Sequence, residues 1–560
     1  MNKIHRLVWN DITRAWVPAA EHTRARGKRG AARLFAAAAL LPLAAWAQVA
    51  PNALPTGGQV VAGQVAIQQN GATLTIQQGS TRGAIDWQQF NVGRDAQVQF
   101  QQPSAQSVTL NRVQGPDASQ IFGRITANGQ VFLSNPHGVY FAPGASVDVG
   151  GLVATTHRIS LDDFMAGRTR FERQGATGSV VNEGELRAAL GGYVALLAPE
   201  VRNQGVIVAN LGTVALAAGE AFELQFDANQ TLAGLRVEAS TLRTLVDNRH
   251  LVLAPGGLVI LSAQALDRVQ GGVVRNAGRI EATGLAQRGG RIVLEASGQV
   301  VNSGRIDASA SADGPAGSVR LQAPEVVNSG SITAAGSAAH PQGGQVEVVA
   351  GSFTQTDAGR IDASAPAQGG RVQLRASGPV ALAGQVSVAA TPLAPAPAAA
   401  PAAAPAPAAH APAEAPAPAQ GGEIDIQAAR IRLPAALLDA SGGQGGRIVL
   451  DAGAPASGAP AAPAPLPAPE RGQVVLQGTA QLSTRGRRGQ GGLITLLGDD
   501  LRLHDQTLLD ASGATGGGSV RVGGGWQGGE GLYAAGPVAR DGGARIDASA
   551  TTQGDGGSVV

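Results

Sequence analysis

The chain of 560 residues contains no cysteine, and among its aromatic residues there are only 11 Phe, 5 Trp and 3 Tyr. Without cysteine, disulfide frameworks, thiolate metal sites and cysteine nucleophiles are excluded. The few large rings argue against an ordinary compact core, which aromatic side chains usually dominate. Hydrophobic residues nevertheless make up 44%, which is too much for a disordered chain, and the 79 glycines lack the every-third period of collagen. The fold must therefore bury small aliphatic side chains and use many glycine turns.

Basic residues are concentrated at the start of the chain. Residues 1–47 carry eight Lys and Arg against two acidic residues, whereas the rest carries 34 Arg against 38 acidic residues. This mildly acidic remainder gives no reason to expect a nucleic-acid partner. An apolar run over residues 34–47 is too short to span a bilayer as a helix and ends in an A-x-A pattern at Ala45 and Ala47. We therefore predict a signal peptide over residues 1–47, cleaved before Gln48.

A short phrase recurs from residue 191 onward: two small residues, a variable residue, and then aliphatic residues that alternate with others. It appears as GGRIVL (289–294), AGSVRL (316–321), GGQVEV (343–348) and GGRVQL (369–374). Alternation with a period of two is typical of a strand with one buried face. The phrases return every 26 or 27 residues, and Asn-x-Gly phrases at Asn276, Asn302 and Asn328 keep the same period. Such a period indicates a repeat array.

Each repeat contains short strands and turns and has no helical periodicity. One unit cannot bury its aliphatic face alone, but stacked units can pair their strands in parallel and form one continuous aliphatic column. Strand-only repeats of this length predict an all-β fold, a parallel β-helix, rather than a leucine-rich horseshoe or a propeller. We expect asparagines at equivalent turns to stack into hydrogen-bonded ladders.

Two proline-rich stretches interrupt the repeats, with nine prolines in residues 391–420 and six in residues 453–470. Because proline cannot donate to a strand ladder, we predict solvated loops or linkers there, the first of which would separate two β-helical blocks. Aromatic residues cluster in residues 48–190, where repeats are weak, and a repeat column needs a distinct first unit to close its exposed end. The predicted division of the chain is a signal peptide (1–47), a capping module (48–190), repeats (191–390), a linker (391–420) and further repeats (421–560).

The stretch VQFQQPSAQSVTLNRVQGPDASQIFGRITANGQVFLSNPHGVYF (98–141), preceded by Phe90-Asn91-Val92-Gly93, resembles the N-terminal secretion domain of the filamentous haemagglutinin family. The resemblance covers roughly residues 52–165, and residues 191–220 look like the family's first β-helical coils. It implies that residues 48–190 are a two-partner secretion domain and that the β-helix is right-handed. It also implies export by the general secretion machinery and passage through an outer-membrane β-barrel transporter. The leader resembles the extended signal peptide of large secreted proteins of Gram-negative bacteria.

Two short asparagine motifs of that family map onto residues 111–113 and 135–139. The resemblance implies a role in transporter recognition for Asn111, Arg112, Val113, Asn135, Pro136 and Gly138. The second motif departs from the common form because it carries His137 in place of asparagine, although Pro136 and Gly138 should preserve the turn. For both motifs, a purely structural role in turns of the β-helix is an open alternative.

No catalytic, metal or cofactor site is expected from the remaining motifs. The eight histidines show none of the close spacings of metal ligands. Aspartates recur singly in Ile-Asp-Ala-Ser phrases, at Asp307, Asp362 and Asp547, which indicates turn chemistry rather than paired catalytic carboxylates. The compact basic patch over residues 485–488 is typical of a solvated turn, with a glycan contact as the alternative.

These observations together predict a secreted, non-enzymatic, filamentous exoprotein of two-partner secretion that acts as an adhesin at the cell surface. Its candidate ligands are host-cell or bacterial surface glycans or receptors. Two alternatives stay open: the stem of a contact-dependent toxin whose C-terminal effector is missing, and a β-helical polysaccharide-degrading enzyme. The sequence ends inside a strand phrase, so we expect a fragment or a truncated product.

Overall fold

The computed structural model describes residues 49–228, 230–267, 271–392, 418–453, 459–460, 472–525, 532 and 534–560, and the backbone of two strands before them. Those strands, β1 (His5–Asn10) and β2 (Ala15–Ala20), pair antiparallel within a separate unit, Met1–Gln48. The second unit, Val49–Val560, holds all the other elements. The predicted cleavage residues Ala45, Ala47 and Gln48 lie outside the described residues.

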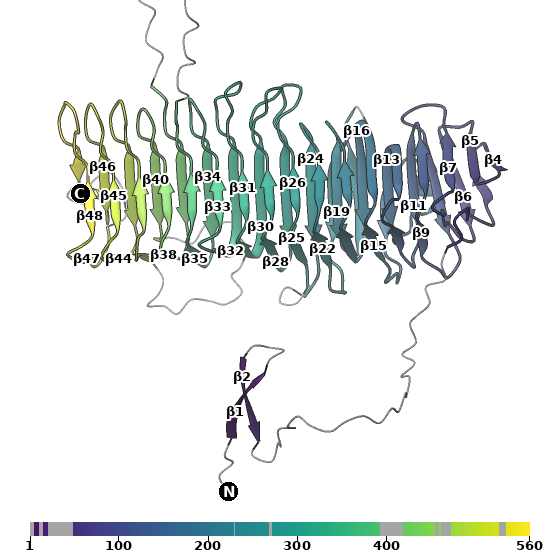
Figure 1. Cartoon of the computed structure of the whole chain (residues 1–560), viewed down its shortest axis with the longest axis horizontal. Coiled ribbons are helices and arrows are strands. Elements are labelled where there is room, and N and C mark those ends of the chain that lie inside the picture. The colour runs from purple at the N-terminus through teal and green to yellow at the C-terminus, as the bar shows by residue number, and fades with distance from the viewer. Residues whose placement is uncertain are drawn as a thin grey trace, which may run out of the picture. The chain divides into compact units, whose positions relative to one another are not determined.

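The second unit is a right-handed parallel β-helix, as predicted, in which successive coils stack three columns of short parallel strands (Figure 1). The first column contains the glycine-led phrases of the sequence. Its strands are β6 (Arg82–Trp87), β8 (Val108–Val113), β11 (Gln130–Ser134), β13 (Ser146–Thr155), β16 (Glu185–Leu197), β19 (Thr213–Ala218), β24 (Leu258–Ala263), β27 (Arg291–Ala296), β30 (Ser318–Asn328), β32 (Gln345–Gln355), β34 (Arg371–Ala376), β37 (Glu423–Gln427), β40 (Arg447–Asp451), β43 (Leu493–Leu497), β46 (Ser519–Val522) and β49 (Ser558–Val559).

The second column contains the strands that end in the Asn-x-Gly turns, and it also takes the later halves of β30 and β32. Its other strands are β9 (Ser119–Ile121), β12 (Val139–Phe141), β15 (Ser179–Asn182), β17 (Glu200–Asn203), β22 (Leu245–Asn248), β25 (Val273–Asn276), β28 (Gln299–Asn302), β35 (Pro379–Leu382), β38 (Arg430–Leu433), β41 (Gln473–Leu476), β44 (Asp500–Leu503) and β47 (Val538–Arg540).

The third column contains the strands of the Ile-Asp-Ala-Ser phrases, and it also takes the first halves of β13 and β16. Its other strands are β5 (Thr73–Gln78), β7 (Gln97–Gln101), β10 (Arg124–Ala127), β18 (Val206–Val208), β23 (Leu251–Leu253), β26 (Arg279–Glu281), β29 (Arg305–Asp307), β31 (Ser331–Thr333), β33 (Arg360–Asp362), β36 (Gln385–Ser387), β39 (Leu437–Asp439), β42 (Gln481–Ser483), β45 (Leu508–Asp510) and β48 (Arg545–Asp547).

Alternate side chains of the strands point inward and form one continuous aliphatic core. In the first column, Ile292, Val319, Val346 and Val372 lie in register in four successive coils and are almost fully buried. Each buried CH₂ group contributes about 0.8 kcal/mol. Stacking of small aliphatic residues therefore stabilises the molecule without the aromatic core of a globular domain.

The β-helix is continuous across residues 393–417. Strand β34 pairs in parallel with β37, and β36 pairs with β39, so the coils before and after the proline-rich stretch are direct neighbours. The two repeat blocks expected from the sequence thus form one column. Most of the two proline-rich stretches, at residues 393–417, 454–458 and 461–470, lies outside the described residues. The domain boundaries drawn from the sequence stay a prediction.

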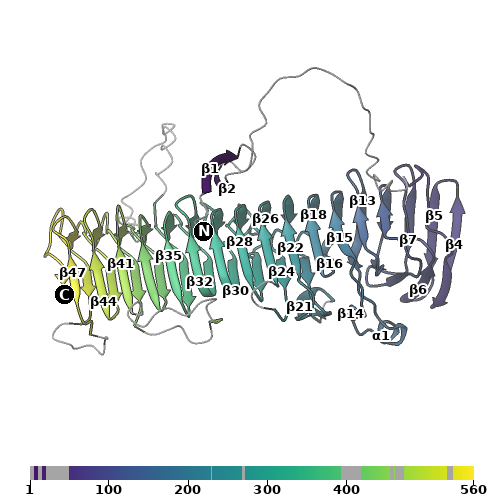
Figure 2. The same cartoon turned by 90° about the horizontal axis from the view of Figure 1, so that it is seen from below.

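Antiparallel strands close the N-terminal end of the column (Figure 2). Strand β4 (Val65–Asn70) forms a hairpin with β5, and β3 (Gln59–Ala62) pairs with β6. This arrangement protects the interior of the first coil, as expected for a capping unit.

A small antiparallel sheet lies on the outer face of the first column. It consists of β14 (Arg170–Glu172), β20 (Ala221–Phe226) and β21 (Leu232–Glu238), and the short helix α1 (Leu161–Met165) accompanies it. Phe164 and Phe222 belong to a second buried cluster together with Phe132 and Tyr193 of the β-helix. Sequence periodicity did not predict this addition. Among the described residues, no helix is long and apolar enough to cross a membrane.

Candidate functional site

The first asparagine motif lies on β8, and its Asn111 joins three neighbouring strands through its side-chain amide. The indole Nε1 of Trp87 on β6 donates to Asn111 Oδ1 over 3.0 Å, and Asn111 Nδ2 donates to the carbonyl oxygen of Phe132 on β11 over 3.2 Å. Asn111 is fully buried. These bonds satisfy a buried amide and a buried indole, so this side chain has a structural role in the coil interior.

The other two residues of this motif face opposite ways, as strand geometry requires. Val113 is buried, whereas the Arg112 guanidinium lies near the surface and contacts Asp86. Arg112 Nε donates to Asp86 Oδ1 over 2.7 Å, and its terminal nitrogen donates to Asp86 Oδ2 over 2.9 Å. The side chains are 21% and 23% exposed. This bidentate pair fixes the guanidinium in one orientation on the surface of the secretion module.

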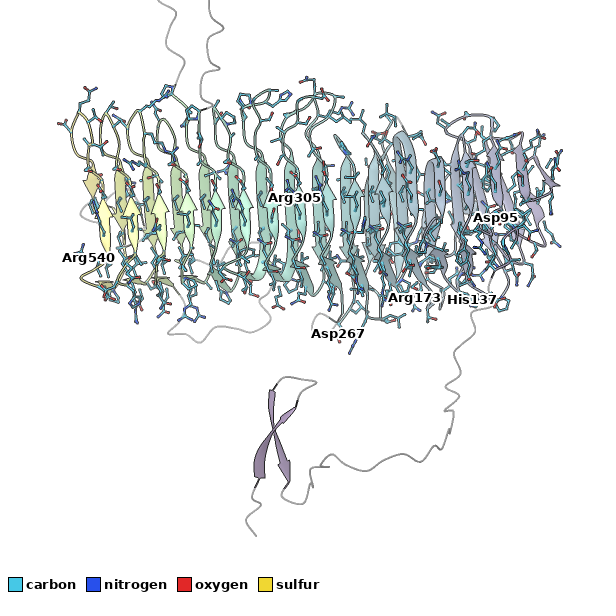
Figure 3. The ribbon with its side chains drawn as sticks, in the orientation of Figure 1. Asp95, His137, Arg173, Asp267, Arg305 and Arg540 are labelled. Carbon is cyan, nitrogen blue, oxygen red and sulfur yellow. The ribbon has the colours of Figure 1, made fainter. Side chains whose placement is uncertain are left out.

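The second motif forms a turn held by Asn135. Its Nδ2 donates to the Asp117 carbonyl oxygen and to Ser119 Oγ, both over 3.0 Å, and its Oδ1 accepts from the His137 backbone N–H over 3.0 Å. Gly138 has a φ of +124°, a conformation that L side chains rarely adopt. The turn uses only the backbone of His137, whose side chain is exposed (Figure 3). Histidine is therefore compatible with this turn, as expected.

The structure brings the two motifs together. In the register of β8 and β11, Arg112 pairs with Ser134, the residue before Asn135. The motifs therefore lie in neighbouring coils, at the carboxyl ends of two adjacent strands of the first column. Their surface presents His137 and the half-buried Pro136 from the turn, and Arg112 with Asp86 from the strands.

His157 is a further residue with a role in this region, and sequence analysis did not identify that role. Ser134 Oγ donates to its backbone carbonyl over 2.7 Å, and its ring Nε2 lies 3.1 Å from the Gly219 carbonyl oxygen, which can only accept. The ring packs on Phe222 with 4.6 Å between centroids. Burial lowers the pKa of His157 to about 4, so the ring is neutral near pH 7. It fastens the outer sheet to the coil of the second motif, and a lone histidine gives no sequence signal of this role.

Arg82 and Tyr193 support the same outer sheet from the β-helix. The Arg82 guanidinium lies 5.3 Å from the centroid of the Phe164 ring, a cation–π contact, and burial lowers its pKa. The Tyr193 hydroxyl donates to Gln130 Oε1 over 2.6 Å, and burial raises the pKa of Tyr193. The contact of Arg82 with Phe164 holds α1 on the first column, whereas the bond from Tyr193 to Gln130 joins β16 to β11 beneath the outer sheet.

The recurring aspartates close turns. Asp307 accepts a hydrogen bond from the Ser309 backbone N–H over 3.0 Å and pairs with Arg305 at 2.6 Å. Burial acts to raise the pKa of Asp307, but these bonds outweigh it, and the net shift is downward. The turn chemistry predicted from the sequence is confirmed at this position. In the part of the chain that the structure describes, no group of three His, Asp or Glu side chains is placed to hold a metal ion.

Comparison with protein families gives two matches that follow one another along the chain. Residues 1–50 match the Extended Signal Peptide of Type V secretion system, and residues 51–308 match the TPS secretion domain. These modules make the chain a two-partner secretion exoprotein, exported through the periplasm and then secreted or exposed at the surface. A TPS domain implies a cognate outer-membrane β-barrel transporter as its partner.

Among curated proteins, the chain is 35% identical over 251 residues to a heme/hemopexin-binding protein of Haemophilus influenzae, covering 43% of this chain and 27% of the relative. A second heme/hemopexin-binding protein of Haemophilus influenzae is 34% identical over 264 residues, covering 43% of this chain and 28% of the relative. The chain thus spans little more than a quarter of the length of these relatives.

Two solved secretion domains were also found. The HMW1 secretion domain from Haemophilus influenzae aligns with a TM-score of 0.41 and 20% identity over 90% of this chain and 100% of its own. A filamentous hemagglutinin secretion domain aligns with a TM-score of 0.32 and 17% identity, covering 54% and 97%. At these scores the fold assignment depends on the strand pairing described above.

Proposed function

We propose that this two-partner secretion exoprotein acts in adhesion at the cell surface and has no enzymatic activity of its own. The observation that supports this function is the unbroken stack of coils behind the secretion module. Such a column is a rigid, extended scaffold with long side-chain faces, which suits binding to another surface rather than the enclosed chemistry of an enzyme. Host-cell or bacterial surface glycans or receptors are the ligands that fit this role.

The test compares bacteria that produce the chain together with its transporter and bacteria that lack the transporter. We expect only the first to adhere to epithelial cells or to other bacteria, and the purified exoprotein to compete for adhesion. Equal adhesion by both strains would contradict the proposal. Release of reducing sugars from polysaccharides by the purified chain would contradict its non-enzymatic part and favour the polysaccharide-degrading alternative.

The names of the two curated relatives suggest a second candidate, capture of haem or hemopexin. It is supported by the 35% identity over 251 residues. Titration of the secreted chain with haem, followed by its absorption spectrum, and a hemopexin pull-down separate the candidates. Binding in either experiment together with absent adhesion would favour this function over the first.

Recognition by the transporter uses the exposed parts of the two asparagine motifs, whereas Asn111, Val113 and Asn135 hold those parts in place. This division is supported by the burial of the three residues and by the surface position of the Arg112–Asp86 pair. Pro136 and Gly138 shape the turn beside it. Export to the periplasm by the general secretion machinery precedes this step.

An Arg112→Ala variant tests recognition, with Arg124→Ala as the matched control, because Arg124 is an exposed arginine of the same module on β10. We expect Arg112→Ala to reduce secretion at unchanged thermal stability, and Arg124→Ala to leave secretion unchanged. Normal secretion of the Arg112 variant would instead support the purely structural role of the motif.

A further inference from the structure

A polar groove runs along the β-helix where successive coils enter the first column. Two cavities of about 430 Å³ and 510 Å³ follow one another along this groove, and each spans four coils. Glycine backbone lines both cavities, at Gly257, Gly290, Gly317, Gly344, Gly370, Gly422 and Gly446. A Cβ atom on Gly317 would lie 1.8 Å from the Gly290 carbonyl oxygen, so no side chain fits there. The close stacking of coils thus leaves a floor of bare backbone.

One rim of the groove is a row of glutamines. The phrase Gln-Gly-Gly occurs in five consecutive coils, led by Gln342, Gln368, Gln420, Gln444 and Gln490. Backbone hydrogen bonds between coils fix the main chain at these glutamines. For example, Gly343 N donates to the Gln368 carbonyl oxygen over 2.9 Å. Their side chains are exposed, and within the described part of the chain no hydrogen bond engages their amides.

The turn itself does not require glutamine. Coils outside this run have Arg288, Gly516 or Asp555 at the equivalent place before the glycine pair. The buried asparagines of the second column differ as well, because each of those amides bonds to the next, as Asn302 Nδ2 does to Asn328 Oδ1. The glutamine row therefore offers donors and acceptors that the fold leaves to solvent.

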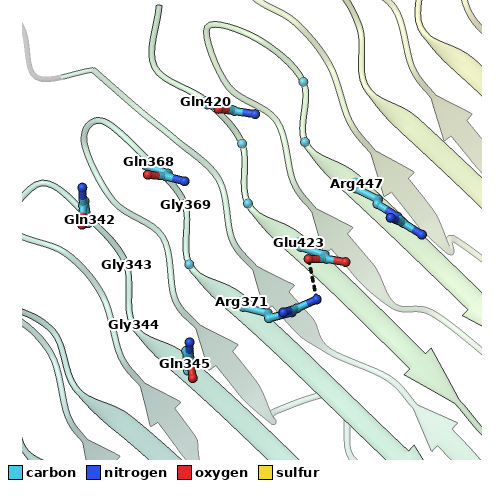
Figure 4. A pocket seen from close by; sticks show the side chains of 15 residues that line it. Gln342, Gly343, Gly344, Gln345, Gln368, Gly369, Arg371, Gln420, Glu423 and Arg447 are labelled. Atoms are coloured by element: carbon cyan, nitrogen blue, oxygen red, sulfur yellow. Dashed lines mark ion pairs between the residues drawn. The ribbon is translucent and has the colours of Figure 1, made fainter.

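The opposite rim carries charge. The residues that follow the glycine pairs stand in parallel register: Gln345, Arg371, Glu423 and Arg447 (Figure 4). Arg371 contacts Glu423 at 2.8 Å, and the exposed Arg447 follows in the next coil. Arg291 takes the same position, after a glycine pair, in the cavity of about 430 Å³. Three guanidinium groups against one carboxylate make the rim net positive, which favours an anionic ligand.

We propose that this groove binds a linear acidic polysaccharide with a carboxylate in its repeating unit. Neighbouring strands stand about 4.8 Å apart, so the rims present an amide or a guanidinium in each successive coil, which suits a polymer with regularly repeated groups. Amides bind sugar hydroxyls as donors and as acceptors, and guanidinium groups bind carboxylates. The bare floor admits a sugar ring close to the backbone. This inference rests on the proposed adhesive function and names its ligand class.

The experiment measures binding of the full secreted chain to four polymers by calorimetry. Hyaluronan represents an animal-surface source, alginate a bacterial source, dextran a neutral polysaccharide and poly-glutamate an acidic polypeptide. We expect hyaluronan, alginate or both to bind, with an affinity that falls as salt increases because exposed charges are screened. Equal binding of dextran or of poly-glutamate, or no binding of either acidic polysaccharide, would overturn the proposal.

Two sets of variants locate the site. We expect a Q342A/Q368A/Q420A variant to bind the acidic polysaccharide at least about tenfold more weakly, since three side-chain amides that hydrogen-bond the ligand are lost. The matched control is Q204A/Q481A/Q553A, which removes three exposed glutamines outside the groove and should bind as the original chain does. A Q368E/Q420E variant retains side-chain size and should repel the ligand. Unchanged affinity in both groove variants would overturn the proposal.

Cell adhesion by the same variants separates this inference from the function on which it rests. If the original chain mediates adhesion and the groove variants do so equally well, the adhesive function stands and the groove assignment fails. If the original chain mediates no adhesion, the proposed function itself fails, whatever the polymers show.

Discussion

The Asn276 side chain donates a hydrogen bond from Nδ2 to Oδ1 of Asn302 over 2.9 Å, and both amides are buried between consecutive coils. The same contact repeats along the second column. The series of donors and acceptors runs through Asn182, Asn203, Asn248, Asn276, Asn302, Asn328 and Gln355. It ends where Gln355 Nε2 donates to the backbone carbonyl oxygen of Ala383 over 3.0 Å. The ladder predicted from the sequence is confirmed, and it fixes the register of the coils, because a shifted coil would leave buried amides unpaired.

Replacing the middle rung tests this ladder. Asn302→Ala leaves Asn276 Nδ2 and Asn328 Oδ1 without their partners in a buried place, so we expect a loss of about 1–3 kcal/mol in local stability. Hydrogen exchange of the β25 and β28 amides, followed by mass spectrometry, measures it. Ser303→Ala, at an exposed position of the same turn, is the control. Equal protection in the two variants would show that the ladder contributes nothing.

The buried His157 predicts a pH dependence. Its pKa is about 4 in the folded chain, below the ordinary value of about 6.5 that applies on unfolding. The unfolded chain therefore binds a proton first as the pH falls, and the stability contribution, complete above pH 6.5, is lost towards pH 4. The loss is on the order of 3 kcal/mol.

Denaturant titrations of the outer-sheet region at pH 7, 5 and 4 measure this effect. A His157→Gln variant should show a flatter dependence, whereas the control His250→Gln, at an exposed position, should follow the original chain. An identical pH profile for the His157 variant would rule out this residue as the cause.

The close stacking of coils makes certain glycines irreplaceable. In Gly317→Ala the new Cβ would lie 1.8 Å from the Gly290 carbonyl oxygen, and backbone would have to move, so we expect a cost above about 2 kcal/mol. Gly542→Ala is the matched control, since nothing lies within 4 Å of a Cβ there. Thermal unfolding followed by circular dichroism compares the two, and similar melting temperatures would contradict the packing argument.

Signal cleavage stays a prediction that can be tested on the secreted protein. Signal peptidases require small side chains in the A-x-A pattern, so the mature chain should begin at Gln48. Peptide mass spectrometry of the mature N-terminus gives the answer. Ala47→Arg should block processing and leave the unprocessed chain in the cell, whereas a mature terminus elsewhere would show the assignment to be wrong.

The sequence predicted the parts of the fold that depend on local repetition. Alternating aliphatic residues with a period of 26 or 27 indicate short stacked strands, and equally spaced asparagines indicate a ladder, since equivalent residues of identical coils must lie above one another. The outer sheet could not be predicted this way. Its Phe164 and Phe222 belong to no repeat, and they pack in one cluster only because the chain returns to the first column two coils later, from β13 to β19.

For the candidate sites, the sequence identified the residue types, and the tertiary structure decided which side chains are buried and which are exposed. Asn111 and Arg112 are neighbours in one motif, yet strand geometry buries the first and leaves the second near the surface beside Asp86. The glutamines before the glycine pairs lie just outside the strand phrases, and sequence analysis did not single them out. The amino-acid sequence by itself determined that the coils are alike, because a repeated pattern of aliphatic residues and glycines gives each coil the same strands and turns. Only the stacking of those coils decided which amides pair in the interior and which face an open groove, because that depends on contacts between residues far apart in the chain.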